Sequence, residues 1–166
     1  MKYLLTGTLV AAVVLVGVWF CLFYLLFPLR YTNEINAAAA TYDVEPALIA
    51  AVINAESGFN KNKVSPKNAI GLMQVLPSTA EYITEKPCNL FDAADNITVG
   101  TQYLAYLIDK FGDVNTALFA YNAGEGNVTR WLSEQQVKQL TTCPFAETNA
   151  YVEKVQKGVK LYRGRI

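Results

Sequence analysis

Residues 47–76 read ALIAAVINAESGFNKNKVSPKNAIGLMQVL, and this stretch decides the fold. Ile49 and Ile53 follow helical spacing, and Glu56 takes the next place in the same apolar stripe. Gly58 predicts a left-handed helix stop, which puts Glu56 in the last turn, near the negative end of the helix dipole. The apolar stripe and the negative end of the helix dipole both disfavour a charged carboxylate. We therefore expect the pKa of Glu56 to be raised, as a general acid requires. The alternative is a Glu that ends an amphipathic helix at the surface.

Most of the apolar excess of the chain lies at its beginning. Residues 3–27 contain no charged side chain, and 25 helical residues rise about 37 Å, more than the roughly 30 Å of a hydrocarbon core. We interpret residues 1–30 as an uncleaved, single-pass transmembrane anchor. A weak excess of positive charge at the amino terminus favours a cytoplasmic start, with residues 31–166 on the extracytoplasmic side of the cell membrane.

A cleaved signal peptide is the alternative for this region. Lys2 provides a short basic start, and the alanines of residues 37–40 resemble a small-residue cleavage site. The apolar run is longer than the about 7–15 residues of a signal peptide, and the cleavage site would lie far beyond its end. These features favour the anchor.

The composition excludes several classes of function. The 166 residues contain 14 basic and 14 acidic side chains, and no basic patch indicates a nucleic-acid partner. Two basic runs, residues 61–67 and 154–165, are interleaved with apolar positions and fit solvated faces; the second also fits a surface for an anionic polymer or lipid. Histidine is absent, which excludes a Ser-His-Asp triad, a Cys-His pair and an HExxH zinc site. We expect carboxylate chemistry without a metal or a cofactor.

Three cysteines are present in the chain. Cys21 lies in the predicted anchor, whereas Cys88 and Cys143 fall in loop-like stretches, EKPCNLFD and TTCPFAET. Outside the cytoplasm these two could form a disulfide that closes a long loop; two unpaired thiols are the alternative. We predict the bridge, with about 2–4 kcal/mol of stabilisation.

Beyond residue 31 the chain shows helical periodicity and no sustained alternation of the kind that predicts strands. The expected helices are residues 33–42, a helix with Pro46 in its first turn and Glu56 in its last, 78–83 with Ser78 as cap, 93–111 ending at Gly112, a helix from the cap Asp113 through Tyr121, and 147–162. No repeat or low-complexity linker separates a second domain. We therefore predict one mostly α domain.

Several short motifs resemble, in order, those of the soluble lytic transglycosylase catalytic domain. They are Glu56-Ser57, Gly71-Leu72-Met73-Gln74, Asn96-Ile97 in a long scaffold helix, Ala120-Tyr121-Asn122-Ala123-Gly124, and Glu147 with Tyr151-Val152. Each motif alone is weak, but their order and separations are specific, and the match covers residues 43–162. The resemblance implies a lysozyme-like, all-helical domain, preceded here by the anchor.

The resemblance also implies roles for residues along a glycan-binding groove, with Glu56 as the catalytic residue. Sugars require flat aromatic faces together with amide and hydroxyl groups. The implied substrate-binding residues are Ser57, Met73, Gln74, Tyr121, Asn122 and Tyr151. Glu147 is expected to support its neighbours rather than act as a second catalyst. For any single tyrosine, packing in the core is the alternative.

Members of this family cleave the β-1,4 bond between N-acetylmuramic acid and N-acetylglucosamine in peptidoglycan. The resemblance implies that Glu56 protonates the leaving oxygen and then deprotonates the C6 hydroxyl of the muramoyl residue, which closes to a 1,6-anhydro product. A hydroxyl held in place has a high effective concentration, so no water-activating carboxylate is needed. The expected partners are peptidoglycan glycan strands, the membrane through the N-terminal helix, and cell-envelope machinery.

Glu125 departs from the family pattern, in which Pro often follows the Ala-Tyr-Asn-Ala-Gly motif. A second carboxylate near the groove would raise the pKa of Glu56 further or activate a water. A hydrolytic muramidase of goose-lysozyme type is therefore the alternative enzyme. A non-catalytic, membrane-tethered peptidoglycan-binding module is the alternative from a different class.

Overall fold

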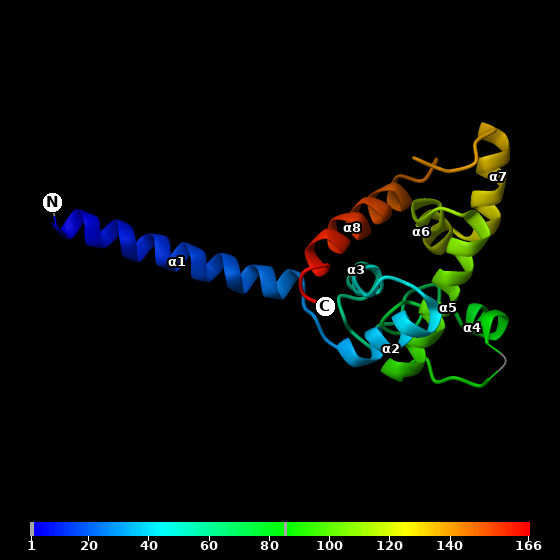
Figure 1. Ribbon diagram of the computed structural model, residues 1–166, viewed down its shortest axis with the longest axis horizontal. Coiled ribbons are helices and arrows are strands. Elements are labelled where there is room, and N and C mark those ends of the chain that lie inside the picture. The colour runs from blue at the N-terminus through cyan, green and yellow to red at the C-terminus, as the bar shows by residue number, and fades with distance from the viewer. Residues whose placement is uncertain (1, 85) are drawn as a thin grey trace.

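The computed structural model describes the backbone of residues 2–84 and 86–166, and the side chains of residues 13–22, 24–84 and 86–166. Within these ranges the chain forms eight helices (Figure 1). They are α1 (Lys2–Leu26), α2 (Thr32–Tyr42), α3 (Pro46–Glu56), α4 (Pro77–Ile83), α5 (Ala93–Phe111), α6 (Val114–Ala123), α7 (Glu125–Gln135) and α8 (Ala146–Tyr162). The β-structure of the described residues is limited to two isolated bridges in the loop between α3 and α4. The prediction of a mostly α domain is confirmed.

The helix ends follow the local sequence in most places. Pro46 occupies the first turn of α3, as predicted. The Asp113 carboxylate accepts the Thr116 backbone N–H at 2.7 Å and so caps α6. The prediction that Ser78 caps α4 is wrong, because this helix begins one residue earlier, at Pro77, and its N-cap residue provides no side-chain hydrogen bond.

Helix α7 was not predicted from the sequence. Only Val128 and Trp131 are buried in its eleven residues, and the rest of the segment is largely polar. Two apolar positions give too weak a helical period to recognise. The helix is stabilised by packing these two side chains into the core rather than by its own pattern.

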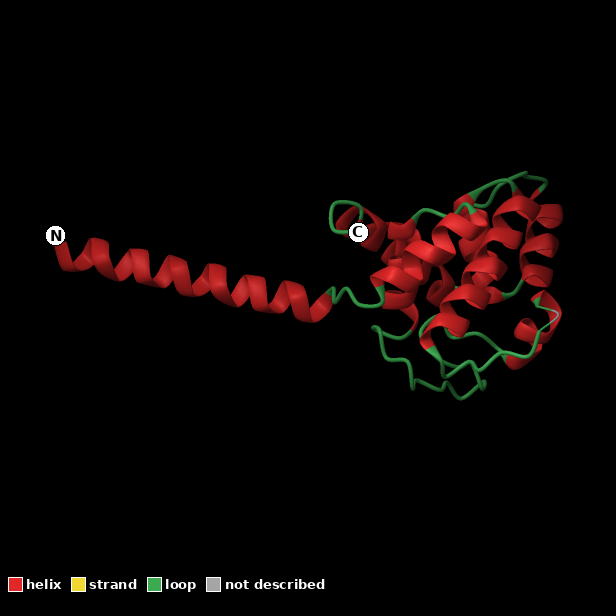
Figure 2. Cartoon of the chain, turned by 60° about the horizontal axis from the view of Figure 1, so that its bottom comes forward, coloured by secondary structure: helices red, strands yellow, loops and turns green. Residues whose placement is uncertain are grey.

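Helix α3 lies at the centre of the domain, and every residue from Ala47 to Ile53 is buried. Helix α8 packs along it closely, since a Cβ added at Gly158 would lie 3.0 Å from the Ala51 Cβ. Helices α5 and α6 complete the bundle, with Leu104 and Leu107 fully buried. Figure 2 shows the helices grouped together and the connecting loops around their edge. The buried middle of α3 therefore separates its two ends, at Pro46 and at Glu56, which lie in different parts of the domain.

Helix α1 projects away from the bundle in both views (Figures 1 and 2). The chain that leaves it is nevertheless held on the domain. The backbone carbonyls of residues 26–28 accept hydrogen bonds from Asn54 (3.3 Å), Arg165 (2.8 Å) and Tyr162 (2.9 Å). Two of these donors lie at the end of α8 and one lies on α3, so the junction contacts both central helices.

The predicted membrane segment, residues 3–27, overlaps α1 along almost its whole length. Its side chains before residue 13, and that of Phe23, lie outside the described residues. Among the residues that are described, no helix is both long and apolar enough to cross a membrane.

The predicted disulfide between Cys88 and Cys143 is wrong, because both thiols are free in the structure. Cys88 lies in the loop that joins α4 to α5, whereas Cys143 lies just before α8, and Figure 1 shows these loops at opposite edges of the domain. The Cys143 thiol donates instead to the Phe145 carbonyl at 3.4 Å, and its backbone N–H donates to Asn149. Both residues were correctly placed in loops, but loop position alone does not bring two sulfur atoms together.

Candidate active site

Glu56 is the last residue of α3, as predicted. The helix stops there because Gly58 adopts φ +62°, in the left-handed region. The carboxyl group is largely buried, and this burial raises its pKa from 4.5 to about 7. A group with this pKa is substantially protonated at neutral pH and can both donate and accept a proton there.

Three neighbours oppose this rise in pKa, in the order Tyr151, Lys63 and Lys154. Lys63 donates to the Glu56 backbone carbonyl, and Lys154 donates to that of Ala55 at 3.0 Å, so both cations contact the last turn of α3 rather than the carboxylate itself. They therefore stabilise the anion without forming an ion pair with it. The carboxyl group keeps its exchangeable proton.

Tyr151 on α8 lies beside this carboxyl group. Its hydroxyl is close enough to lower the pKa of Glu56. The hydroxyl is nevertheless buried, and none of the described residues lies in hydrogen-bonding geometry with it. An unsatisfied buried hydroxyl is costly, so such a group is commonly completed by a ligand or a water. The Tyr151 hydroxyl is therefore a polar group available to a substrate next to Glu56.

The loop between α3 and α4 forms one wall of the site, and Asn96 of α5 fixes it. The buried Asn96 amide accepts the Met73 backbone N–H at 2.8 Å and donates to the carbonyls of Ile70 and Leu90, both at 2.9 Å. Gly71 allows this approach, because a Cβ there would lie 2.2 Å from the Asn96 side chain. One buried amide thus ties together three segments of backbone.

Gln74 and Tyr121 join this loop to α6. The Gln74 side-chain N–H groups donate to the carbonyls of Lys63 (3.0 Å) and Gly71 (2.9 Å), which leaves its carbonyl oxygen to face a ligand. Gln74 has φ +49°, an unusual backbone conformation for a residue other than glycine and one found often at functional sites. The Tyr121 hydroxyl donates to the Met73 carbonyl at 2.9 Å, which fixes the tyrosine ring.

These residues surround a groove of about 520 Å³ with Glu56 in its wall. The groove is lined by Glu56, Ser65, Pro66, Lys67, Ala69, Gln74, Leu76, Tyr121, Asn122, Ala123, Asn127, Phe145, Glu147 and Thr148. The lining combines aromatic rings, amides and hydroxyls, which is typical of a saccharide site. It brings together residues from five parts of the chain around one protonatable carboxyl group.

Residues 33–142 match the family described as the transglycosylase SLT domain. The chain belongs to this family. It is 36% identical over 136 residues to a transglycosylase of Enterobacteria phage PRD1, covering 82% of this chain and 45% of that protein. It is 33% identical over 153 residues to the soluble lytic murein transglycosylase of Escherichia coli K12, covering 82% of this chain and 23% of that protein.

Solved structures agree with this assignment to the SLT domain family. An inactive mutant of the lytic transglycosylase Slt from Pseudomonas aeruginosa superposes with a TM-score of 0.77 at 27% identity, covering 86% of this chain and 25% of that one. The 70-kDa soluble lytic transglycosylase of Escherichia coli gives a TM-score of 0.76 at 31% identity, covering 83% and 25%. The chain therefore spans less than half the length of the curated relatives and solved structures named here.

The SLT domain places the predicted site residues in three kinds of position. Gln74, Tyr121, Asn122 and Glu147 line the groove with Glu56. The Ser57 hydroxyl instead donates to the Ile53 carbonyl of its own helix at 3.1 Å. The Met73 side chain does not reach the groove: it is fully buried against α5, where a Cβ at Gly100 would lie 2.6 Å from its sulfur. Met73 contributes through its backbone, which the prediction of a substrate contact missed.

Glu147 was expected to support its neighbours. Its side chain is exposed at the rim of the groove, and none of the described residues forms a hydrogen bond or ion pair with it. It is thus free to contact a bound molecule, and the structure gives no sign of a supporting role.

Glu125, the departure from the family pattern, points away from Glu56. Its carboxylate accepts from Lys110 at 2.7 Å and from the Tyr106 hydroxyl at 3.1 Å. The Lys110 hydrogen bond lowers the pKa of Glu125, and this residue is not among the groups that shift the pKa of Glu56. The expectation that Glu125 would raise the pKa of Glu56 is therefore wrong.

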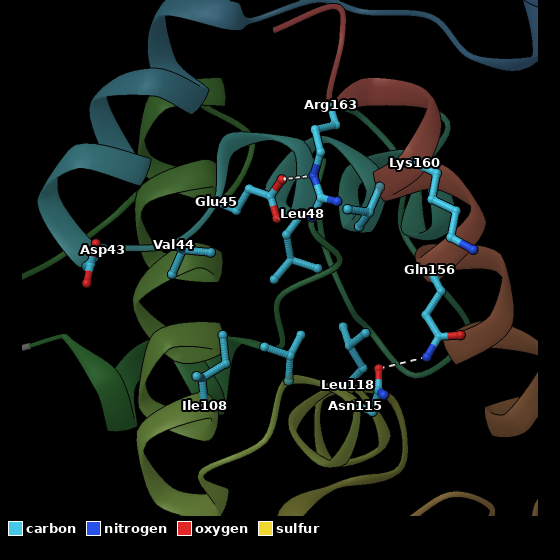
Figure 3. Close-up of a pocket in the computed structure, with 12 residues that line it drawn as sticks. Asp43, Val44, Glu45, Leu48, Ile108, Asn115, Leu118, Gln156, Lys160 and Arg163 are labelled. Carbon is cyan, nitrogen blue, oxygen red and sulfur yellow. Dashed lines mark hydrogen bonds and ion pairs between the residues drawn. The ribbon is translucent and has the colours of Figure 1, made fainter.

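A second cavity of the SLT domain, of about 550 Å³, lies at the opposite end of α3 (Figure 3). Its floor is apolar, with Leu48 and Leu118, and its rim carries the ion pair between Glu45 and Arg163. The Arg163 hydrogen bond lowers the pKa of Glu45, so this carboxyl group is ionised at neutral pH. Although this cavity is slightly larger, the groove at Glu56 is the candidate active site, because it alone of the two contains a carboxyl group that exchanges a proton near pH 7.

Proposed function

We propose that this SLT domain is a peptidoglycan lytic transglycosylase. It would cleave the β-1,4 bond between N-acetylmuramic acid and N-acetylglucosamine and leave a 1,6-anhydromuramoyl product. The observation that carries this proposal is the Glu56 carboxyl group, which has a pKa of about 7 in the wall of a saccharide-like groove. The relatives named as lytic murein transglycosylases support the same activity.

The mechanism uses Glu56 twice. The protonated carboxyl group first donates its proton to the glycosidic oxygen, and the bond between that oxygen and C1 of the muramoyl residue breaks. The resulting carboxylate then takes the proton of the C6 hydroxyl of the same sugar as the C6 oxygen bonds to C1. Glu56 ends protonated, and no water is consumed. A pKa near neutrality suits a group that must act as both acid and base.

The other groove residues hold the sugar in place for this ring closure. The Tyr121 ring offers an apolar face, and the Gln74 carbonyl and Asn122 amide offer hydrogen bonds to acetamido and hydroxyl groups. The Tyr151 hydroxyl, which lacks a full hydrogen bond in the structure, would be completed by the substrate. Ser57 and Met73 shape the site from behind, through the last turn of α3 and the loop backbone. Precise positioning is worth most in this reaction, because the nucleophile belongs to the substrate.

Digestion of purified peptidoglycan, followed by mass spectrometry of the fragments, tests this proposal. Products with 1,6-anhydromuramoyl ends, lighter by one water than hydrolysis products, support the transglycosylase. Reducing ends instead would indicate a hydrolytic muramidase, and binding without fragments would indicate a non-catalytic peptidoglycan-binding module. The pairing of Glu125 with Lys110 disfavours the hydrolase, since it removes the candidate second carboxylate.

We also propose that residues 1–30 form a single-pass membrane anchor and residues 31–166 an extracytoplasmic catalytic domain that serves cell-envelope machinery. The uncharged run of residues 3–27 and the uninterrupted 25-residue helix α1 support this. One relative is the membrane-bound lytic murein transglycosylase C of Histophilus somni, 34% identical over 167 residues. Fractionation of cells expressing the full chain tests the proposal: we expect it in the membrane fraction. A soluble protein that begins near Thr41 would contradict the anchor.

A further inference from the structure

A row of tyrosine rings leads out of the groove across α5. The ring of Tyr121 in the groove lies 5.5 Å from that of Tyr103, measured between centroids. Tyr103 stacks on Tyr106 at 6.2 Å, and Tyr106 contacts Tyr82 of α4 edge-on at 5.8 Å. These four residues, which we call the tyrosine row, form one continuous aromatic path from Glu56's groove to α4.

The tyrosine row ends in solvent at α4. Tyr121, Tyr103 and Tyr106 are half-buried, and Tyr82 at the far end is 62% exposed. Tyr82 therefore presents an aromatic face to solvent at the end of the row. Leu76, which lines the groove, immediately precedes α4, so the helix that carries Tyr82 begins at the groove.

Hydrogen bonds hold the outer rings in place. The Tyr82 and Tyr106 hydroxyls lie 3.0 Å apart, and Tyr106 also contacts Glu125 and Lys110, both at 3.1 Å. Lys110 and Glu125 neutralise each other at 2.7 Å. The outer part of the row is therefore a surface of rings and hydroxyl groups with no net charge. Glu125 helps to hold the Tyr106 ring in this surface.

We propose that the tyrosine row extends the glycan groove and binds sugar units beyond those at Glu56. The ligand is a further stretch of the same polysaccharide, because sugar rings present apolar C–H faces to aromatic rings and hydroxyl groups to the polar edges. This inference rests on the proposed function for the identity of the polymer. If the tyrosine row binds these additional sugar units, affinity should depend on the length of the glycan strand rather than on its charge.

Binding measured without turnover tests this inference. All variants carry Glu56→Gln, so that strands are not cleaved, and their dissociation constants are measured for long peptidoglycan glycan strands and for a short fragment. We expect Tyr82→Ala to weaken binding of long strands about two- to tenfold, the range expected for one aromatic contact. Binding of the short fragment should change by less than this, because the fragment does not reach α4.

Two further variants serve as controls. Tyr82→Phe keeps the ring and should retain most of the binding that Tyr82→Ala loses. Phe91→Ala removes an exposed aromatic side chain outside the tyrosine row, 45% exposed, and should leave both dissociation constants unchanged. Equal binding of long strands by the Tyr82→Ala protein and its parent would overturn the inference, as would an equal loss for long and short ligands. Failure of the unmutated protein, with Glu56 in place, to cleave peptidoglycan would count against the proposed function alone, since this binding test needs no cleavage.

Discussion

The two ends of α3 carry carboxyl groups in opposite states. Glu45 at the first end accepts two hydrogen bonds from Arg163, at 2.7 and 2.9 Å, and this pairing lowers its pKa. Glu56 at the last end is largely buried, and its pKa rises to about 7. Their partners differ: Glu45 pairs with the guanidinium of Arg163, directly after α8, whereas Glu56 lies beside the hydroxyl of Tyr151 on α8. The comparison shows that solvent and partner, rather than residue type, decide which Glu can transfer a proton.

The first prediction concerns the catalytic rate of a variant in which Glu56, at the last turn of α3, cannot exchange a proton. We expect Glu56→Gln to lower the rate of peptidoglycan cleavage by at least about 10⁴-fold, because one residue performs both proton transfers and each is worth roughly 10²–10⁴-fold. Binding of glycan strands should persist. The rate of release of soluble fragments measures the loss.

Glu45→Gln is the matched control, since it makes the same chemical change at the other end of α3. It should cleave peptidoglycan at the parent's rate. If Glu56→Gln keeps more than about a tenth of the parent's activity, Glu56 is not the catalytic acid and base. Glu147, which lines the same groove, would then be the next carboxylate to test.

The second prediction concerns Asn96, the amide that fixes the loop beside the groove. Asn96→Ala deletes three hydrogen bonds in the core and leaves their backbone partners unsatisfied, so we expect a loss of about 2–4 kcal/mol in the free energy of unfolding. The looser loop should also admit water and move the pKa of Glu56 back toward 4.5. Chemical denaturation measures the first effect and the pH dependence of kcat/KM the second. Asn36→Ala, at an exposed position of α2 where the side chain forms no hydrogen bond with the described residues, is the control and should lower neither.

The third prediction concerns stability and pH. Because the folded-state pKa of Glu56 is above its unfolded value of 4.5, the folded protein binds the extra proton between pH 4.5 and about 7, and its stability falls as pH rises through this window. Glu56→Gln has no such loss. We expect the variant to be more stable than the parent at pH 8, by at most about 3 kcal/mol, and equal to it at pH 4. Chemical denaturation of both proteins at pH 4 and pH 8 measures the difference. If Glu56→Gln is less stable than the parent at pH 8, burial does not disfavour the Glu56 carboxylate.

The fourth prediction concerns the opposite end of α3. The folded-state pKa of Glu45 is lowered, so its contribution is present above pH 4.5 and is lost as pH falls through the folded value. The pair is well exposed, with 65% of the Arg163 side chain and 40% of that of Glu45 accessible. We therefore expect Glu45→Gln to cost less than about 1 kcal/mol at pH 7, and less still in high salt. A larger loss would mean that the ion pair holds α8 against α3.

The fifth prediction concerns Lys154, which lies beside the last turn of α3. Lys154 lowers the pKa of Glu56 and also donates to the last turn of α3. Lys154→Met removes this charge, so the pKa of Glu56 should rise further. The decline of kcat/KM at alkaline pH, where Glu56 loses its proton, should then move to higher pH. An unchanged pH profile would show that the lysine acts only on the backbone.

The sequence predicts the acid, its helix and the order of the groove motifs because these are local. Pro46 marks the start of α3, Gly58 marks its end just after Glu56, and burial follows from the apolar stripe. The groove residues Asn127, Phe145 and Thr148 were missed. They reach the site through the packing of α7 and α8, and no local pattern marks them.

Most of the wrong predictions depend on distances between segments far apart in the chain; the exception is the Ser78 cap, which misplaces a helix start by one residue. Cys88 and Cys143 are both in loops, but at different edges of the bundle. Glu125 follows directly after a groove motif, yet Lys110 of α5 draws its carboxylate away. Met73 lies in the loop that forms one wall of the groove, and the direction of its side chain, into the core beside Gly100, could not be predicted from the sequence.

The clamped junction after α1 has a mechanical consequence. Asn54 holds the carbonyl of Leu26 and lies two residues before Glu56 on the same helix, while Tyr162 and Arg165 hold the next two carbonyls. A force that tilts or pulls α1 therefore acts on the last turn of α3 directly, with no slack linker to absorb it. If α1 were held from outside, tension on it would reach Glu56 as torque on the helix that carries this residue.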